Sequence, residues 1–413
     1  MLLLFVVDGR SPIAENWMNY LLERDYEIHL VSSYPGNFDH RFASVSVIPV
    51  AFSNAVSGRG VGDRGIISGP KIFGGSAVKL RTYIRQWLGP LSLKTAAAKL
   101  SERIKEIKPD LIHAMRIPFE GMLLSLAETK ALRLVSVWGN DFTLHAKSNP
   151  IMMKYTRQAL LKMDGLHADC ERDIRLAYQL GYKKSNPTIV LPGGGGVQLD
   201  IFYPAEKDFI DRLSDDRQEI HTVERGRGNK PRPRVINPRG YRAYVRNDIF
   251  FKAIPLVLAK NPDVEFFCPN MEDVPNAVKW INTLGISENV KLLPKLSRDQ
   301  MANLFRSCSV CVSPSTHDGT PNTLLEAMAS GCFPVIGDIE SIREWIEPGV
   351  NGILFNPTDP EELASGILLA IENDNLCETA RIKNLKMITE RAEYQKVMKK
   401  VEGFYRELLG SRN

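Results

Sequence analysis

The alternation of short apolar runs with amphipathic segments constrains the fold of this chain most. Residues 2–7, 111–114 and 132–139 are rich in aliphatic side chains and predict strands. Residues 15–25 and 94–110 carry apolar side chains at helical spacing and predict helices. Strands that alternate with helices favour parallel βαβ units, so the expected fold class is α/β.

The same alternation returns after a stretch of different composition. Residues 206–233 are highly charged, poor in apolar side chains and end in Gly, Pro and Arg, which is typical of a linker or an exposed insertion. We therefore expect a Rossmann-like domain over 1–205, a charged linker or insertion over 206–233, a second Rossmann-like domain over 234–385, and a C-terminal helical segment over 386–413. Open parallel sheets bind ligands at the carboxyl ends of their strands.

The N-terminal apolar run is short and follows no basic residue, which argues against a signal peptide. The sequence contains no stretch close to the roughly 18 apolar residues of a membrane-spanning helix. We therefore expect a cytoplasmic protein.

The cysteines and the acidic cluster give no sign of a metal site. Cys308 and Cys311 are close in sequence, but a second such pair is missing, so buried, reduced thiols are expected. The run DCERD at 169–173 is interpreted as a solvated helix face. No metal or cofactor is predicted.

Two acids flank a turn and a helix start in the stretch SPSTHDGTPNTLLEAMASG. Pro321 disfavours helix at the residue before it, so a helix should begin near Asn322 or Thr323. Its free N–H groups form an anion site, and Asp318 and Glu326 could accept hydrogen bonds from hydroxyls on either side. This is the polarity pattern of a sugar nucleotide. The alternative is a capping box, in which Glu326 reaches back to Thr323.

This stretch resembles the E-x7-E signature of glycosyltransferase family 4, which has the GT-B fold. The similar residues are HDGTPNTLLEAMASGCFPVIGD at 317–338. Further segments resemble family motifs in the same order: KPDLIHAMRIPFEG (108–121), VSVWGNDF (135–142), LPGGGGVQLDIFYP (191–204) and the run 284–315. The resemblance implies two facing Rossmann-like domains with a cleft between them, and a C-terminal helix that packs back on the first domain.

The resemblance also implies roles for the residues between the two acids. In the family, the first acid binds the donor sugar, the second binds the ribose, and the helix start holds phosphate. These roles fall here on Asp318, on Glu326, and on the donor-binding segment Gly319, Thr320, Pro321, Asn322 and Thr323.

A basic loop of the family neutralises the donor diphosphate with an Arg and a Lys. The corresponding residues here are NPRGYRAYVRND, at 237–248. Arg239 matches the Arg, and Arg246 stands in for the Lys at a spacing longer by two, with Arg242 as a competitor. We assign Asp318, Arg239 and Arg246 to catalysis and Arg242 to donor binding; the alternative is a solvated basic loop.

The N-terminal half is expected to bind the acceptor. Met115 stands where the family has its second histidine, so neighbours such as Arg116 and Glu120 would have to substitute for it. The stretch 77–88 is basic and amphipathic, which suits contact with an anionic membrane or an ordinary surface helix. The expected residues on this side are Gly9, Arg10, His113, Arg116, Glu120 and Asp141.

The resemblance implies a retaining hexosyltransferase in polysaccharide biosynthesis. It would move a sugar from a UDP- or GDP-sugar to a glycan, a lipid-linked or a small-molecule acceptor, without a metal. Peripheral contact at the inner face of the plasma membrane is a further expectation, and no nucleic acid is expected. The alternatives are an inactive sugar-nucleotide-binding protein, favoured by Met115, and another GT-B enzyme such as a nucleotide-sugar epimerase.

Overall fold

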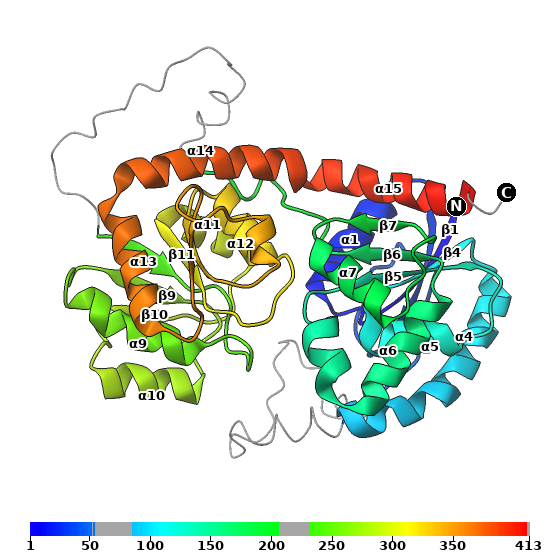
Figure 1. Ribbon diagram of the computed structural model, residues 1–413. Helices are drawn as coiled ribbons and strands as arrows, with labels where there is room; N and C mark the ends of the chain where they lie inside the picture. Colours follow the sequence, from blue (N-terminus) through cyan, green and yellow to red (C-terminus); the bar gives the residue numbers. More distant parts are fainter. Residues whose placement is uncertain (52, 54–84, 206–231, 411–413) are drawn as a thin grey trace, which may run out of the picture. The chain divides into compact units, whose positions relative to one another are not determined.

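The computed structural model describes residues 1–51, 53, 85–205 and 232–410 (Figure 1). Most of the predicted linker at 206–233 lies outside the described residues, as do residues 77–84 of the basic amphipathic stretch. The chain divides into two compact units. Unit 1 comprises 1–195 and 398–413, and unit 2 comprises 196–397.

Unit 1 is built on a parallel seven-stranded sheet with the spatial order β3-β2-β1-β4-β5-β6-β7. Parallel sheets are covered on both faces, which explains why β1 is an unbroken apolar run and is almost wholly buried. The strands are β1 (Leu2–Val7), β2 (Glu27–Ser32), β3 (Ser44–Val47), β4 (Leu111–Ala114), β5 (Leu132–Val137), β6 (Gly165–Ala168) and β7 (Thr188–Val190).

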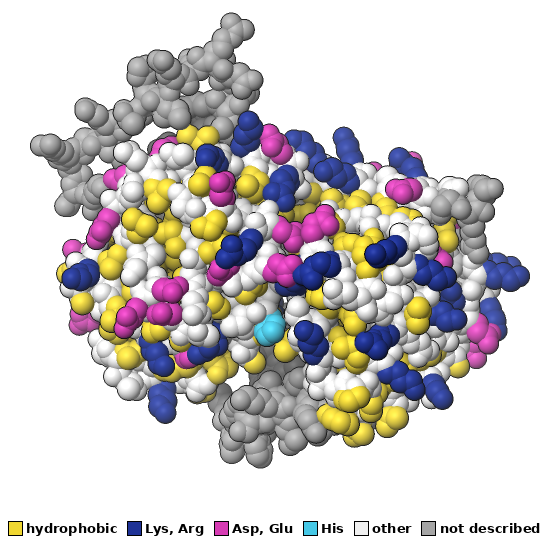
Figure 2. Space-filling model, viewed as in Figure 1, with side chains coloured by type: hydrophobic (Ala, Val, Ile, Leu, Met, Phe, Trp, Pro, Cys, Tyr) yellow, Lys and Arg dark blue, Asp and Glu magenta, His cyan; other side chains and the backbone are white. Residues whose placement is uncertain are grey.

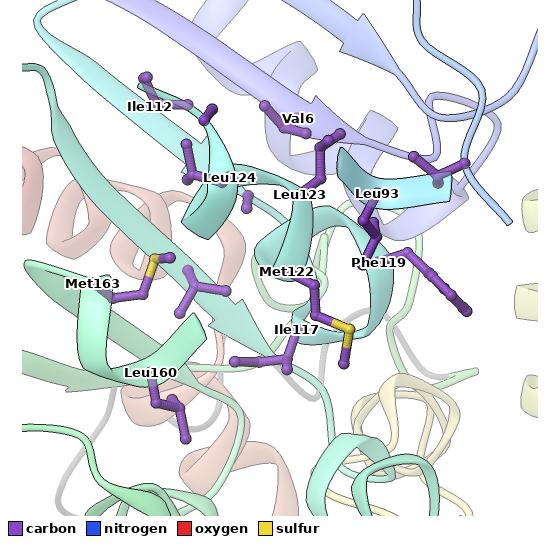
Figure 3. Packing of buried hydrophobic residues seen from close by; sticks show 14 of the residues in the cluster. Val6, Leu93, Ile112, Ile117, Phe119, Met122, Leu123, Leu124, Leu160 and Met163 are labelled. Atoms are coloured by element: carbon purple, nitrogen blue, oxygen red, sulfur yellow. The ribbon is translucent and has the colours of Figure 1, made fainter. Parts of the chain in front are cut away.

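The helices of unit 1 form its outer layers. α4, α5 and α6 lie side by side on one face of the sheet (Figure 1). Between them and the sheet, Val6 and Ile112 meet Leu123 and Leu124 in the apolar core (Figure 3). The helices are α1 (Pro12–Leu22), α4 (Leu93–Ile107), α5 (Met122–Leu126), α6 (Pro150–Lys162) and α7 (Glu171–Leu180), with the short turns η1 (Gly89–Ser92), η2 (Ile117–Gly121), η3 (Asp141–His145) and η4 (Ala146–Ser148).

Unit 2 repeats this plan with a six-stranded parallel sheet of order β10-β9-β8-β11-β12-β13. The strands are β8 (Arg234–Ile236), β9 (Glu265–Cys268), β10 (Val290–Leu292), β11 (Val310–Ser313), β12 (Phe333–Gly337) and β13 (Ile353–Phe355). The helices are α9 (Asn247–Leu258), α10 (Pro275–Leu284), α11 (Arg298–Ser307), α12 (Asn322–Ala329), α13 (Pro360–Glu372), α14 (Asp374–Arg391) and the start of α15 (Tyr394–Gly410), with the turn η5 (Ile342–Glu344). The predicted α/β class is confirmed in both units.

The boundaries of the units differ from the predicted domains. Residues 196–205 cluster with unit 2, because Val197 pairs with Glu393 and Phe202 packs against Phe305. The C-terminal segment is divided: α14 and the start of α15 belong to unit 2, and the chain from Met398 onward belongs to unit 1.

A buried chain of hydrogen bonds ties α15 to the sheet of unit 1. The indole N–H of Trp17 donates to the Tyr405 hydroxyl (3.0 Å), which lies 2.8 Å from Nδ1 of His113. Nε2 of His113 lies 2.7 Å from the Ser136 hydroxyl, which in turn lies 2.8 Å from Nδ1 of His167. The last member, Nε2 of His167, lies 2.9 Å from the Leu191 carbonyl.

One arrangement of protons satisfies every bond of this chain. The Leu191 carbonyl can only accept, so Nε2 of His167 carries the proton and its Nδ1 accepts from Ser136. His113 then donates from Nε2 and accepts from Tyr405. Both rings must be neutral, and burial lowers the pKa of His167 to about 4 and that of His113 well below its usual value.

Tyr405→Phe should destabilise unit 1 by about 2 kcal/mol or more, because it leaves the Trp17 N–H and Nδ1 of His113 buried without partners. Urea or thermal unfolding measures this loss. The matched control is Tyr155→Phe, because the half-buried Tyr155 hydroxyl makes no hydrogen bond to any described residue. Equal stability of the two variants would contradict the role given to the chain.

Candidate functional site

The N-terminus of α12 is open, as the prediction of an anion site requires. The helix begins at Asn322, where the sequence places it, and its N-cap residue Pro321 provides no side-chain hydrogen bond. The alternative capping box is not formed, because Thr323 and Glu326 do not cap the helix. The N–H groups of Asn322 and Thr323 therefore remain available to a ligand, whereas that of Leu324 donates to the Pro321 carbonyl at 3.0 Å.

Arg239 lies at this helix start. It follows β8, and its Nη1 donates to the Thr323 hydroxyl at 3.1 Å while its Nη2 donates to Oδ2 of Asp318 at 2.5 Å. Its Nε is buried and has no hydrogen-bond partner among the described residues. The structure thus brings together three residues that the sequence assigned to one site: Arg239, Asp318 and Thr323.

The loop that carries Asp318 is held from both sides. The Asp318 carbonyl accepts a hydrogen bond from the Ser341 hydroxyl at 2.8 Å. The Thr320 hydroxyl accepts one from the indole N–H of Trp345 at 2.9 Å. Gly319, Thr320 and Pro321 are buried, so the backbone of the predicted phosphate-binding segment is fixed before any ligand arrives.

Glu326 is half-buried on α12, on the same face as Thr323 because residues three apart are neighbours on a helix. Burial raises the pKa of its carboxyl to about 7, against the opposing effect of Arg298. Within the described part of the chain, no hydrogen bond reaches this carboxyl. Glu326 is therefore an acid with free acceptor capacity one turn from the open helix start.

The other two arginines of the basic loop have partners of their own. Arg246 forms a bidentate ion pair with Asp248 at the start of α9, with distances of 2.8 and 2.7 Å. Arg242 is exposed, and its Nη1 donates to the Tyr244 hydroxyl at 3.2 Å. The backbone of this loop does lie beside the strand end that leads to Asp318, since the Arg246 N–H donates to the Pro314 carbonyl at 2.9 Å.

On the acceptor side, the structure corrects the expectation for His113. This residue is buried, and both ring nitrogens are engaged in the chain that includes Tyr405 and Ser136. Its ring therefore faces the interior of unit 1 and not a ligand. Met115 is buried as well.

The remaining acceptor-side residues follow the carboxyl ends of β1, β4 and β5. Arg116 donates from Nε to Oδ1 of Asp141 at 2.8 Å, and the buried Asp141 also accepts from the Ile117 N–H at 3.3 Å. Asp141 thus positions Arg116 and does not reach solvent itself.

Two more of these residues have local partners. Arg10 pairs with Asp8, and the Gly9 N–H donates to the Ser32 hydroxyl at 3.1 Å. A side chain at Gly9 would collide with Phe38.

Residues that the sequence analysis missed also lie at this edge. The hydroxyl of Ser33 donates to Oε1 of the buried Glu120 at 2.5 Å. The guanidinium of Arg85 lies 5.2 Å from the ring centre of Tyr34. The run SSYPG at 32–36 begins at the last residue of β2 and places a hydroxyl and an aromatic ring at a strand end. It is the sequence signal from which Ser33 and Tyr34 could have been predicted.

The acidic cluster at 169–173 is not the solvated face that the sequence suggested. Asp169, Cys170, Arg172 and Asp173 are all buried. Arg172 forms a bidentate pair with Asp173, which explains how the carboxylate is accommodated there. Among the described residues, Asp169, Cys170 and Asp173 are close enough to share a cation, and the cation beside Asp173 is the Arg172 guanidinium.

The two close cysteines are buried thiols, as expected. Cys308 and Cys311 are free and buried, and burial raises the pKa of the Cys308 thiol to about 12. On the face drawn in Figure 2, basic and acidic side chains are interspersed with apolar ones. Within the described residues, no helix combines the length and the apolar character needed to cross a membrane.

The chain matches two family models of glycosyltransferases. The model of glycosyl transferases group 1 matches residues 227–387, and the glycosyl transferase 4-like model matches residues 74–169. An uncharacterized glycosyltransferase of Methanocaldococcus jannaschii is 29% identical over 160 residues, which cover 38% of this chain and 45% of that protein. The matches thus span less than half the length of the first curated relatives.

Solved structures share the fold over nearly the whole chain. Sucrose-phosphate synthase of Thermosynechococcus elongatus has a TM-score of 0.74 at 14% identity, covering 99% of both chains. Anabaena HepE, solved in complex with UDP and also with UDP-glucose, has a TM-score of 0.70 at 15% identity in the UDP complex, covering 98% of this chain and 100% of that one. The chain therefore belongs to glycosyltransferase family 4 and has the GT-B fold.

Proposed function

We propose that this protein transfers a hexose from a UDP- or GDP-sugar to a hydroxyl of an acceptor, with retention of configuration and without a metal ion. The acceptor would be a glycan, a lipid-linked or a small molecule, as in polysaccharide biosynthesis. The observation that carries the proposal is the contact of Arg239 with both Thr323 and Asp318 at the open start of α12.

The chemistry of the donor explains this arrangement. Negative charge grows on the phosphate oxygens of the leaving nucleoside diphosphate as the glycosidic bond breaks. A fixed guanidinium and the amides of a helix start stabilise that charge without having to reorganise. Such preorganised stabilisation of the transition state is usually the largest contribution to the rate in sites of this kind. In this proposal Arg239 and α12 take the part that a metal ion has in other transferases.

The two acids suit the two ends of the donor. Asp318 is held beside the phosphate position, where its carboxylate can accept hydrogen bonds from the hydroxyls of the sugar while it keeps its contact with Arg239. Glu326 lies one turn further along α12 with free acceptor capacity, which suits the ribose hydroxyls. UDP and UDP-glucose are ligands of the structural neighbour HepE, which supports UDP-sugars as the first donors to test.

A second candidate, a sugar-nucleotide-binding protein without transfer activity, is favoured by one observation. Met115 replaces the family's second histidine, and its side chain is buried and apolar. Binding of a nucleotide sugar without its hydrolysis or transfer would support this candidate.

Arg239→Ala should weaken the binding of UDP-sugars or GDP-sugars by about 10- to 100-fold, because it removes charge-assisted hydrogen bonds worth about 1.5–3 kcal/mol. Calorimetric titration against a panel of nucleotide sugars measures this loss. The control is Arg343→Ala, which removes another arginine of unit 2 that is paired with Asp338 at the surface. The proposal fails if no member of the panel binds the wild-type protein, or if Arg239→Ala binds it equally well.

The affinity for UDP-glucose should rise about tenfold between pH 6 and pH 8. With a pKa of about 7, Glu326 is mostly protonated at pH 6 and mostly ionised at pH 8, and hydroxyls donate preferentially to the ionised form. The two phosphates of UDP-glucose keep the same charge over this range. The same titration with Glu326→Gln should be independent of pH, and a variant that retains the full wild-type slope would exclude Glu326 as its source.

A further inference from the structure

Among the described residues of unit 1, Arg85 is a cation that forms no ion pair. Its side chain is half-buried, and its Nε is fully enclosed yet makes no hydrogen bond among the described residues. The guanidinium lies 4.7 Å from the ring centre of Phe119 and 5.2 Å from that of Tyr34. Aromatic faces attract a cation but provide no acceptor for its N–H groups, so the hydrogen-bonding capacity of Arg85 is unused.

A second arginine reaches the same aromatic ring. The Arg10 guanidinium lies 3.8 Å from the ring centre of Tyr34, so Arg10 and Arg85 both border this buried tyrosine. Their charges are balanced differently, because Arg10 has Asp8 as its partner at 3.0 Å. Within the described part of the chain, Arg85 forms no ion pair.

Three charged or titratable groups lie near Arg85, and none of them forms an ion pair with it. Arg116, which is electrostatically coupled to both Glu120 and His145, is already paired with Asp141. Glu120 is buried, and its Oε1 accepts a hydrogen bond from the Ser33 hydroxyl. Burial raises the pKa of its carboxyl, whereas the charge of Arg85 lowers it. His145 is neutral at pH 7, because burial and the two arginines lower its pKa to about 4.

The backbone around this group is strained. Arg116 has φ 152° and Phe119 has φ 71°, values that residues other than glycine rarely adopt. Arg116 directly precedes η2, the turn that carries Glu120, and Phe119 lies within it. Such residues persist where the surrounding structure holds them, and they cluster at binding sites. Arg10, Tyr34 and Phe119 follow β1, β2 and β4, at the edge where parallel sheets bind ligands. Arg85 reaches this edge from the segment between β3 and β4.

We propose that Arg85, assisted by Arg10 and Tyr34, binds an oxyanion carried by the acceptor, a phosphate or a carboxylate group. The planar guanidinium can hold two oxygens of either group at once, and it needs no existing ion pair to be broken. The proposal rests on the transferase function proposed above and narrows its acceptor to an anionic one.

The test measures binding of glucose, glucose 6-phosphate, glucuronate and inorganic phosphate to the full chain saturated with UDP. The wild-type protein should bind glucose 6-phosphate or glucuronate at least tenfold more tightly than glucose, and the better of the two identifies the anionic group. Arg85→Ala should abolish this preference, whereas Arg85→Lys should retain part of it because the charge remains. The matched control is Arg157→Ala, which removes an exposed arginine of α6.

Several outcomes would overturn the proposal. Equal binding of glucose and its anionic derivatives would remove the need for a cation, and an unchanged preference in Arg85→Ala would exclude this residue. Equal affinity for inorganic phosphate would mean that the site takes a free anion and not an acceptor. If UDP does not bind the wild-type protein while the anion preference still depends on Arg85, the transferase function fails and the anion site stands.

Discussion

The open start of α12 is the feature on which the candidate donor site depends. A helix leaves its first N–H groups without acceptors inside the helix, and many helices cover them with the side chain of Ser, Thr, Asp or Asn. Here Pro321 occupies the N-cap and has no side-chain acceptor. Thr323, a candidate cap in the sequence, accepts its hydrogen bond from Arg239 instead. The positive end of the helix thus lies beside a guanidinium that is paired with the Asp318 carboxylate.

Both units collect polar residues at the carboxyl ends of their parallel strands, but the charges of these residues differ. Parallel strands end on one edge of a sheet, so the residues that follow them are collected there regardless of their distance in sequence. At this edge of unit 2, Arg239 follows β8 and Asp318 follows β11. In unit 1 the residues after β1, β2, β4 and β5 are mostly paired with one another, as Arg116 is with Asp141. Arg85 reaches this edge from the segment between β3 and β4, through the rings of Tyr34 and Phe119, and forms no ion pair with any described residue.

Much of the donor site could be predicted because it depends on local sequence. Pro321 and the apolar spacing after it determine where α12 begins, and the separation of Thr323 and Glu326 places both on one helix face. The choice between a capping box and a ligand site could not be made from sequence, since Glu326 can reach back to the helix start in an isolated segment. In the structure the capping box is not formed, and the Thr323 hydroxyl accepts from Arg239, 84 positions away in the chain.

The sequence by itself determined the α/β class, the parallel strands and the position of the open helix start, because periodicity and Pro chemistry act over a few residues. It misjudged His113 and the cluster at 169–173, because burial depends on packing that a local stretch of sequence does not show. His113 is enclosed by Tyr405 from the end of the chain, and Asp173 is buried because Arg172 neutralises it. That Arg85 forms no ion pair with any described residue is likewise a property of tertiary packing, since the rings of Tyr34 and Phe119 that it contacts come from other parts of the chain.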